Sequence, residues 1–163
     1  MNLSHPVAML ETASPALSFH QCVENAMGER LRASSIDTVQ VNIGLKCNLA
    51  CRHCHVESSP KREEAMSWET MGAVLRAARQ AGARTLDITG GAPEMHPRFR
   101  AFVAAALAQR LTVMVRTNLT ILLQPGYETL VAFYAAHPIH LVASLPCYLP
   151  NNVDRQRGRH VYR

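Results

Sequence analysis

The hydrophobic positions of the chain change their spacing several times, from every second residue to every third or fourth. Residues 37–44 (DTVQVNIG) alternate and are rich in β-branched side chains, which predicts a strand. A helix is predicted over residues 67–82, between an N-cap serine and a terminal glycine. Its apolar side chains recur at helical spacing: Trp68, Met71, Val74, Leu75 and Ala78.

The same alternation of strand and helix continues along the chain. Further strands are predicted over residues 84–89, 111–117 and 139–145, and further helices over residues 97–110 and 126–137. This order predicts an α/β fold, in which helices cover a parallel sheet. The strands are apolar nearly throughout, which indicates burial of both sheet faces. No further complete helix is expected after the fourth strand.

The predicted domain organisation is a short N-terminal extension followed by one βα domain. Residues 1–36 are heterogeneous, with a short helix within residues 18–31, and residues 37–163 carry the repeating pattern. A closed barrel needs eight strands, whereas four are predicted here. We therefore expect a partial barrel, the truncated piece of a larger one. We expect such a chain to have little stability and little or no activity on its own.

Composition indicates the class of protein and the compartment in which it is expected. Apolar residues make up 48% and charged residues 18% of the 163 positions, as in globular domains. No apolar run is long enough to cross a bilayer, and the N-terminus lacks the basic start of a secretory signal. Five cysteines, three of them clustered, favour reduced thiols in the cytoplasm. The sequence predicts a cytoplasmic protein with no membrane partner.

The net charge of +5 comes partly from the terminal segment DRQRGRHVYR. A nucleic-acid surface calls for basic residues interleaved with exposed aromatic ones, and aromatic residues are only 6% of the chain. A solvated basic tail is the simpler interpretation, so no nucleic-acid partner is predicted.

Three cysteines lie within GLKCNLACRHCH, directly after the first predicted strand: Cys47, Cys51 and Cys54. The polar segment 56–66 follows, and a long insertion at the carboxyl end of a parallel strand is where α/β proteins place their chemistry. An odd number of cysteines and a reducing compartment disfavour a disulfide. A single nucleophile leaves two thiols unexplained. A metal site remains.

Two kinds of metal site fit the cysteine stretch to different degrees. Structural zinc takes four ligands, often from two Cys-x-x-Cys pairs. Cys51 and Cys54 form one pair, which Cys47 with His53 or His55 would complete, but no second pair lies downstream. Three thiolates on a four-iron cluster would instead leave one iron open to a substrate. An iron–sulfur cluster is favoured, and a zinc-stabilised binding module stays as an alternative.

The spacing Cys-x-x-x-Cys-x-x-Cys after the first strand of a repeating βα chain resembles the radical S-adenosylmethionine (SAM) enzymes, from about residue 37 onward. The resemblance implies a partial barrel whose [4Fe-4S] cluster is held by Cys47, Cys51 and Cys54. It implies that the fourth iron binds the amino and carboxylate groups of SAM. Reductive cleavage then gives methionine and a 5′-deoxyadenosyl radical, with an electron from a low-potential donor such as flavodoxin or ferredoxin.

The resemblance also assigns cofactor-binding positions near the first two strands. His53 stands where the family has an aromatic residue beside the adenine. The second strand ends in TGGAPE, where the family has Gly-Gly-Glu against the SAM amino group. Gly90 and Gly91 match and Glu94 is displaced by two residues, so carbonyls around Gly91 and Ala92 are the other candidates. An ordinary tight turn is the alternative for the glycine pair.

Three further positions follow the later strands. Asn118 and Ser144 end the third and fourth strands, where the family makes ribose and carboxylate contacts, and Arg157 suits the SAM carboxylate. Each has a plainer interpretation: a turn cap, a buried hydroxyl bonded to backbone, and a solvated surface residue, respectively. The SAM-binding assignments of these three residues are favoured only because all three are expected at the same end of consecutive strands.

Several longer stretches resemble one subgroup, the arsenosugar-biosynthesis radical SAM proteins: VNIGLKCNLACRHCHVESSPKREEAMS, LDITGGAPEMHPRFR, NLTILLQPG and ASLPCYLPNNVDRQRG. This implies transfer of the 5′-deoxyadenosyl group to a small-molecule substrate, trivalent dimethylated arsenic. Cys147 follows the fourth strand, and a soft thiolate suits As(III), which makes it the catalytic candidate. A buried, inert cysteine is the alternative. A non-catalytic cluster-binding fragment remains the alternative for the whole chain.

Overall fold

The computed structural model describes residues 17–162, so the first sixteen residues of the expected extension lie outside the described part. Contacts divide the chain into two units, residues 1–34 and residues 35–163. In the first unit, helix α1 (Phe19–Met27) begins at a capping box formed by Ser18 and Gln21. It ends at Gly28, whose left-handed conformation is a common helix stop.

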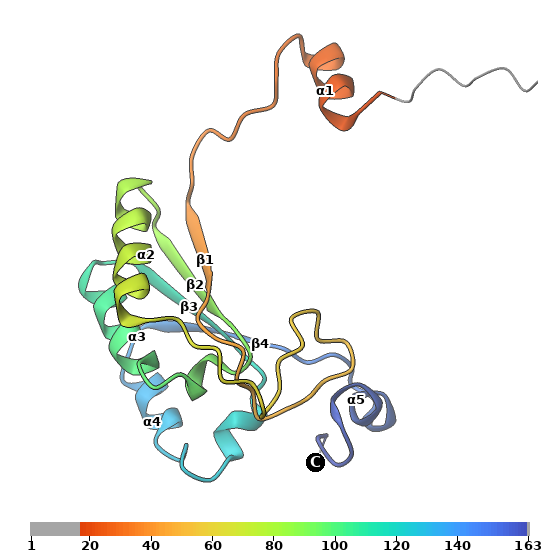
Figure 1. Cartoon of the computed structure of the whole chain (residues 1–163), viewed down its shortest axis with the longest axis vertical. Helices are drawn as coiled ribbons and strands as arrows, with labels where there is room; N and C mark the ends of the chain where they lie inside the picture. The colour runs from red at the N-terminus through yellow and green to blue at the C-terminus, as the bar shows by residue number, and fades with distance from the viewer. Residues whose placement is uncertain (1–16, 163) are drawn as a thin grey trace, which may run out of the picture. The chain divides into compact units, whose positions relative to one another are not determined.

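The second unit is built on a four-stranded parallel sheet with the order β1-β2-β3-β4 (Figure 1). The strands are β1 (Thr38–Asn42), β2 (Thr85–Thr89), β3 (Thr112–Thr117) and β4 (Ile139–Ala143). The connecting helices are α2 (Trp68–Gln80), α3 (Phe99–Ala108) and α4 (Leu130–Ala135). The expected α/β fold with a parallel sheet is confirmed.

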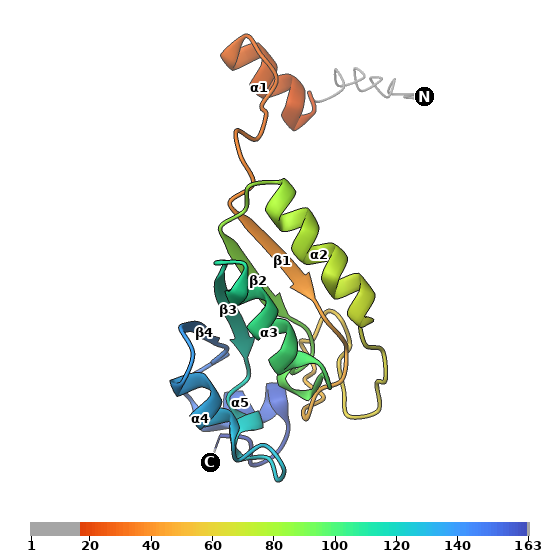
Figure 2. The same ribbon diagram turned by 90° about the vertical axis from the view of Figure 1, so that its left-hand side faces the viewer.

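All three connecting helices cover the same face of the sheet (Figures 1 and 2). Strands that follow one another in both sequence and space carry successive crossover helices on one side, as in a barrel wall. The covered face holds the main core, where fully buried side chains of sheet and helices meet: Leu86, Ile88, Val113, Val115, Met71 and Phe102. Trp68 is an exception to the predicted helix face, since it is 47% exposed.

The opposite face of the sheet is polar, so the expectation that both faces are buried is wrong. Gln40, Asp87, Met114 and His140 are register neighbours across the four strands. Gln40 and His140 are exposed, and β4 has no buried residue. Helices on one side only leave the other side free to carry polar groups.

A further helix follows β4, which corrects the expectation that none is complete there. Helix α5 (Pro150–Arg157) begins with a proline in its first turn and ends at Gly158. Only Val153 and Arg157 are buried in it. An eight-residue helix without an apolar stripe gives no periodic signal.

Short helical turns also shape the carboxyl ends of two strands. The 3₁₀ turn η1 (Pro93–Met95) follows β2, and η2 (Thr120–Leu123) follows β3. Helix α4 is shorter than the range 126–137 expected for it. Within residues 17–162, none of the helices combines the length and apolar character that crossing a membrane requires.

Candidate functional site

A cavity of about 480 Å³ lies at the carboxyl ends of the strands. Nine of the twelve predicted site residues line it: Cys47, Cys51, His53, Cys54, Gly90, Gly91, Asn118, Ser144 and Arg157. They come from the segments after all four strands and from α5, so the fold gathers residues that are more than 100 positions apart in sequence. Ala92, Glu94 and Cys147 are not part of its lining.

The cysteine stretch belongs to a loop, residues 44–66, whose two arms are bonded to each other. The Leu45 N–H donates to the Glu64 carbonyl at 3.0 Å, and the Cys47 N–H donates to the Ser59 carbonyl at 3.1 Å. An isolated antiparallel bridge joins Gly44 and Ala65. The returning arm therefore fixes the cysteines against the end of β1.

The glycine pair after β2 packs against this loop at backbone distance. The Gly91 N–H donates to the Gly44 carbonyl at 2.9 Å. A Cβ at Gly90 would lie 2.7 Å from the Gly44 carbonyl oxygen, and one at Gly91 would collide with the Lys46 carbonyl. Both positions therefore require glycine, and the reason lies in the loop contact as well as in the turn. Ala92 is buried, and its carbonyl accepts the Met95 N–H, so Ala92 is turned away from the cavity.

Two of the three cavity thiols, Cys47 and Cys54, accept hydrogen bonds from N–H donors. The Leu49 N–H and the Asn118 amide donate to Cys47 Sγ, at 3.4 and 3.6 Å. Burial nevertheless raises the pKa of Cys47, and it also raises that of Cys51, where the Arg157 charge opposes it. Burial thus favours the neutral thiol at Cys47 and Cys51, and the N–H donors around Cys47 Sγ would stabilise it as a thiolate ligand.

The donor geometry distinguishes a cluster from a single ion. Within residues 17–162, no three His, Cys, Asp or Glu side chains converge on one point that could hold a metal ion. A structural zinc ion needs four such donors around it, whereas a [4Fe-4S] cluster takes one thiolate at each ligated iron. Three free thiols on the wall of one cavity fit the cluster. His53 and His55 line the same cavity, but they do not converge with the thiols on one point.

Arg157 is 7% exposed, so its alternative interpretation as a solvated surface residue is wrong. Its guanidinium donates to the Asn118 carbonyl at 3.2 Å, to the Ser144 hydroxyl at 2.8 Å and to the Ser144 carbonyl. No carboxylate is among these partners, and the buried Nε atom has no partner at all. A buried cation without an acidic partner beside a cavity suits the carboxylate of a ligand.

Asn118 and Ser144 both have structural bonds in addition to lining the cavity. The Asn118 side-chain oxygen accepts from the Ile121 N–H at 3.1 Å and from the Thr120 hydroxyl at 3.0 Å. Asn118 thus caps η2, as its plainer interpretation proposed, while its amide faces Cys47. The Ser144 hydroxyl donates to the Thr117 carbonyl at 3.3 Å and accepts from Arg157.

Glu94 lies in the core rather than in the cavity, which corrects its predicted place against SAM. It is 5% exposed, and its Oε1 atom accepts from the Tyr134 hydroxyl at 2.9 Å. Burial and the neighbouring Glu94 both raise the pKa of Tyr134. The inserted residues Ala92 and Pro93 begin the η1 turn, which carries the carboxylate beneath the sheet end toward α4.

Cys147 is half-buried, so it is not the inert core cysteine of the alternative interpretation. The Leu149 N–H and the Asn152 amide donate to its sulfur at 3.4 and 3.5 Å. These hydrogen bonds lower the pKa of Cys147. The thiol follows Ser144 by three residues, yet it lies outside the cavity lining, and its catalytic role stays a prediction.

Sequence reasoning missed polar residues that surround the cavity. Ser58 lines it and is 5% exposed. Gln40 also lines it and donates to Asp87 at 2.7 Å, and Arg116 donates to the same carboxylate at 2.8–3.0 Å. Burial alone would raise the pKa of Asp87, but hydrogen bonds from Arg116 and Gln40 hold it below its ordinary value. The available signal was that polar residues stand at every second position of these strands.

Comparison with known proteins matches residues 41–146 to the family model of the Radical SAM superfamily. A probable GTP 3′,8-cyclase of Methanopyrus kandleri is 32% identical over 71 residues, 44% of this chain and 22% of that protein. The subtilosin biosynthesis protein AlbA of Bacillus subtilis is 32% identical over 85 residues, 52% of this chain and 19% of that protein.

The fold is similar to that of Streptococcus suis SuiB, with a TM-score of 0.62 and 19% identity over 85% of this chain. SuiB structures include one bound to SAM and one bound to the precursor peptide SuiA. The chain spans 30% of the SuiB chain and about a fifth of each curated relative. Since the family model covers well over half of its residues, the chain belongs to the radical SAM superfamily.

Proposed function

We propose that the protein holds a [4Fe-4S] cluster through Cys47, Cys51 and Cys54 and cleaves SAM reductively. The observation that carries this proposal is one cavity, lined by three thiols and by a buried guanidinium that has no acidic partner. When bound, the cluster supplies a low-potential electron and one iron site open to a ligand. The matched family and the SAM-bound relative support the same chemistry.

The residues of the chain bind and orient SAM in this proposal. Arg157 pairs with the SAM carboxylate through its unpartnered side, and the remaining guanidinium bonds fix it to Asn118 and Ser144. His53 is exposed at the cavity wall and offers a flat ring to the adenine. The amino group is left to backbone carbonyls near Gly91, since Glu94 is buried elsewhere.

For the substrate we propose trivalent dimethylated arsenic, the soft centre implied by the arsenosugar-type stretches of the sequence. One electron added to SAM would break its C5′–S bond and release methionine, and the C5′ radical would form a bond to arsenic. Arsenic(III) becomes arsenic(V) in the product, so one electron would leave arsenic again, and the oxidised cluster is the proposed acceptor. Cys147 is the proposed thiolate for arsenic, because N–H donors lower its pKa. The second candidate substrate is a peptide, which is favoured by the printed roles of two relatives: subtilosin biosynthesis and binding of a precursor peptide.

The proposal also includes the redox setting. The five cysteines are free thiols, and free thiols together with an iron–sulfur cluster belong in a reducing compartment such as the cytoplasm. The electron would come from a low-potential carrier such as flavodoxin or ferredoxin.

The test is anaerobic reconstitution followed by incubation with dithionite and SAM. The wild-type chain should bind about four iron per chain and release 5′-deoxyadenosine. Cys51→Ala should lose both, and Cys22→Ala, which changes the exposed cysteine of α1, should lose neither. Stoichiometric zinc in place of iron would contradict the proposal. A loaded cluster without 5′-deoxyadenosine would identify the non-catalytic alternative.

To identify the substrate, dimethylarsinous acid or a peptide is added to the same reaction mixture. Cys147→Ser should still produce 5′-deoxyadenosine but should no longer transfer the adenosyl group to arsenic. Transfer at the wild-type rate by this variant would remove Cys147 from the mechanism. No adenosyl–arsenic product from the wild-type chain would favour the peptide.

A further inference from the structure

Ser58 carries a buried hydroxyl that has no hydrogen-bond partner in the protein. Within the described residues, three buried side-chain atoms are unpartnered: Ser58 Oγ, Glu94 Oε2 and Arg157 Nε. Of these residues, Ser58 and Arg157 line the cysteine cavity, and Ser58 is 95% buried. Because a buried hydroxyl without a partner destabilises the fold, this one points to a partner that the polypeptide does not provide.

The immediate neighbour of Ser58 in the cavity is Cys54. The Ser58 N–H donates to Cys54 Sγ at 3.4 Å, and the Glu57 N–H donates to the Cys54 carbonyl at 3.1 Å. Glu57 has a φ of 52°, a left-handed conformation that is unfavourable for this residue type. Such a conformation persists only where surrounding contacts enforce it. The turn at Glu57 therefore places Ser58 in contact with the sulfur of Cys54.

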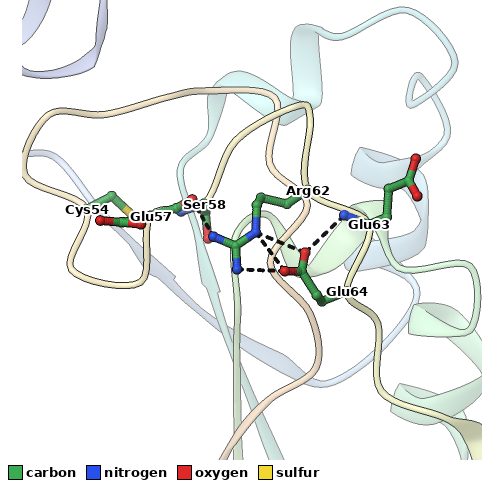
Figure 3. Close-up of polar contacts among 6 residues, drawn as sticks. All are labelled: Cys54, Glu57, Ser58, Arg62, Glu63 and Glu64. Carbon is green, nitrogen blue, oxygen red and sulfur yellow. Dashed lines mark hydrogen bonds and ion pairs between the residues drawn. The ribbon is translucent and has the colours of Figure 1, made fainter.

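Contacts that enforce the turn come from the returning arm of the loop (Figure 3). The Arg62 guanidinium donates to the Glu57 carbonyl at 3.2 Å and to both oxygens of Glu64 at 2.9 Å. The Ser59 carbonyl accepts from the Cys47 N–H and from the Arg62 N–H. The backbone of Ser58 thus lies in a segment that is anchored on both sides, which keeps the residue at the cavity wall beside Cys54.

We propose that Ser58 is a positioning residue for the iron–sulfur cluster, with its hydroxyl donating a hydrogen bond to the sulfur atoms at the Cys54 corner. This inference rests on the proposed function, because it assumes that Cys54 is a cluster ligand. The backbone N–H and the hydroxyl then act on the same corner. Hydrogen bonds to cluster sulfurs stabilise the reduced form, which carries one more negative charge, and so raise the reduction potential.

The test is a reductive titration of the reconstituted chain, followed by the electron paramagnetic resonance signal of the reduced cluster. Ser58→Ala removes only the hydroxyl and keeps the N–H bond to Cys54. Its cluster should load as in the wild type, and its equilibrium constant for one-electron reduction should fall about threefold to tenfold, a potential about 28 to 59 mV lower. Normalising the signal to the loaded fraction makes this readout independent of yield.

Two matched variants control the result. Ser59→Ala makes the same change at the next position, whose side chain does not line the cavity, and should leave the potential unchanged. Ser58→Thr keeps a hydroxyl and should restore the wild-type potential. A loaded Ser58→Ala variant with the wild-type potential would overturn this inference alone. A wild-type chain that takes up no cluster would overturn both this inference and the proposed function.

Discussion

The two faces of the sheet are made of the same four strands, yet they serve different purposes (Figure 2). The face under α2, α3 and α4 is apolar and closed, with Leu86 and Val113 fully buried. The other face carries the Gln40–Asp87–Arg116 network and continues into the cysteine cavity through Gln40. Packing on the covered face thus fixes the positions of the strand ends. Polar groups of the uncovered face and of the loops form the site at these strand ends.

The difference shows that stability and chemistry are separable in this fold. Substitutions on the covered face should change the free energy of unfolding first, and substitutions on the uncovered face or in the cavity should change ligand binding or pH dependence first. Four predictions test this separation.

The largest effect is expected on the covered face. Leu86→Ala should lower the free energy of unfolding by about 2–5 kcal/mol, because it leaves a cavity in a core that cannot collapse around it. Thr112→Ala is the matched change on the uncovered face: Thr112 is exposed on the neighbouring strand and should change stability by no more than about 0.5 kcal/mol. Urea denaturation measures both, and equal losses would remove the distinction between the faces.

A smaller effect on binding is expected in the cavity. Arg157→Gln should weaken SAM binding to the reconstituted protein about tenfold to a hundredfold, because a charge-assisted hydrogen bond is worth about 1.5–3 kcal/mol. Arg155→Gln changes an exposed arginine of the same helix and should leave the affinity unchanged. Equilibrium titration with SAM gives the two dissociation constants. Similar weakening in both variants would indicate a general charge effect in place of a specific contact.

An effect of about 1–2 kcal/mol is expected from Arg116→Met, which leaves the Asp87 carboxylate buried without its cation. The expected loss of stability is modest because the Arg116 side chain is 47% exposed, and solvent weakens its attraction to Asp87. The pH dependence of stability should become weaker. In the wild type the lowered pKa of Asp87 contributes stability that is present above about pH 3.9 and is lost below it. In the variant, burial raises this pKa and only the Gln40 hydrogen bond still opposes it, so the stability that is gained above about pH 3.9 should shrink. Urea midpoints between pH 3 and 7 measure both slopes, and parallel curves would contradict the pairing.

The smallest effect is expected in the loop arm, from Arg62→Gln. Hydrogen bonds from Arg62 lower the pKa of Glu64 to about 2. The Arg62–Glu64 pair therefore stabilises the folded loop fully at pH values above about 4.3, the pKa of an unfolded Glu. This stabilisation is lost as the pH falls through about 2. Amide hydrogen exchange at Leu45 and Cys47 should be a few times faster in the variant at neutral pH, with no change in the thermal midpoint. The difference in exchange between the variant and the wild type should fall to about half at pH 2 and vanish below it.

The repeating strands and helices of the fold could be predicted from the sequence. Period and β-branching located the four strands and three helices, and the cysteine spacing located the loop that the cavity is built on. The uncovered face was misjudged because the apolar residues at the other positions of each strand drew attention, and the alternating polar residues such as Gln40 and Asp87 were not recognised as a second, polar face. Helix α5 was missed because its residues are polar, although Pro150 and Gly158 mark its ends.

Other site features depend on geometry that no local pattern contains. Glu94 is buried because the η1 turn redirects the chain after Gly91, and Ser58 is buried because Arg62 and Ser59 hold its turn. The family resemblance made Arg157 a candidate for the SAM carboxylate, but its contacts with Asn118 and Ser144 could not be predicted before α5 was known. These residues gain their roles from contacts with distant segments.

Whether Cys47, Cys51 and Cys54 hold a cluster with one iron open to SAM is tested most directly by the electron paramagnetic resonance spectrum of the reduced, reconstituted chain with and without SAM. We expect a signal from a reduced [4Fe-4S] cluster that changes its g-values when SAM is added and that is absent in Cys51→Ala. A wild-type spectrum that SAM leaves unchanged, or a chain that binds zinc and gives no signal, would contradict it.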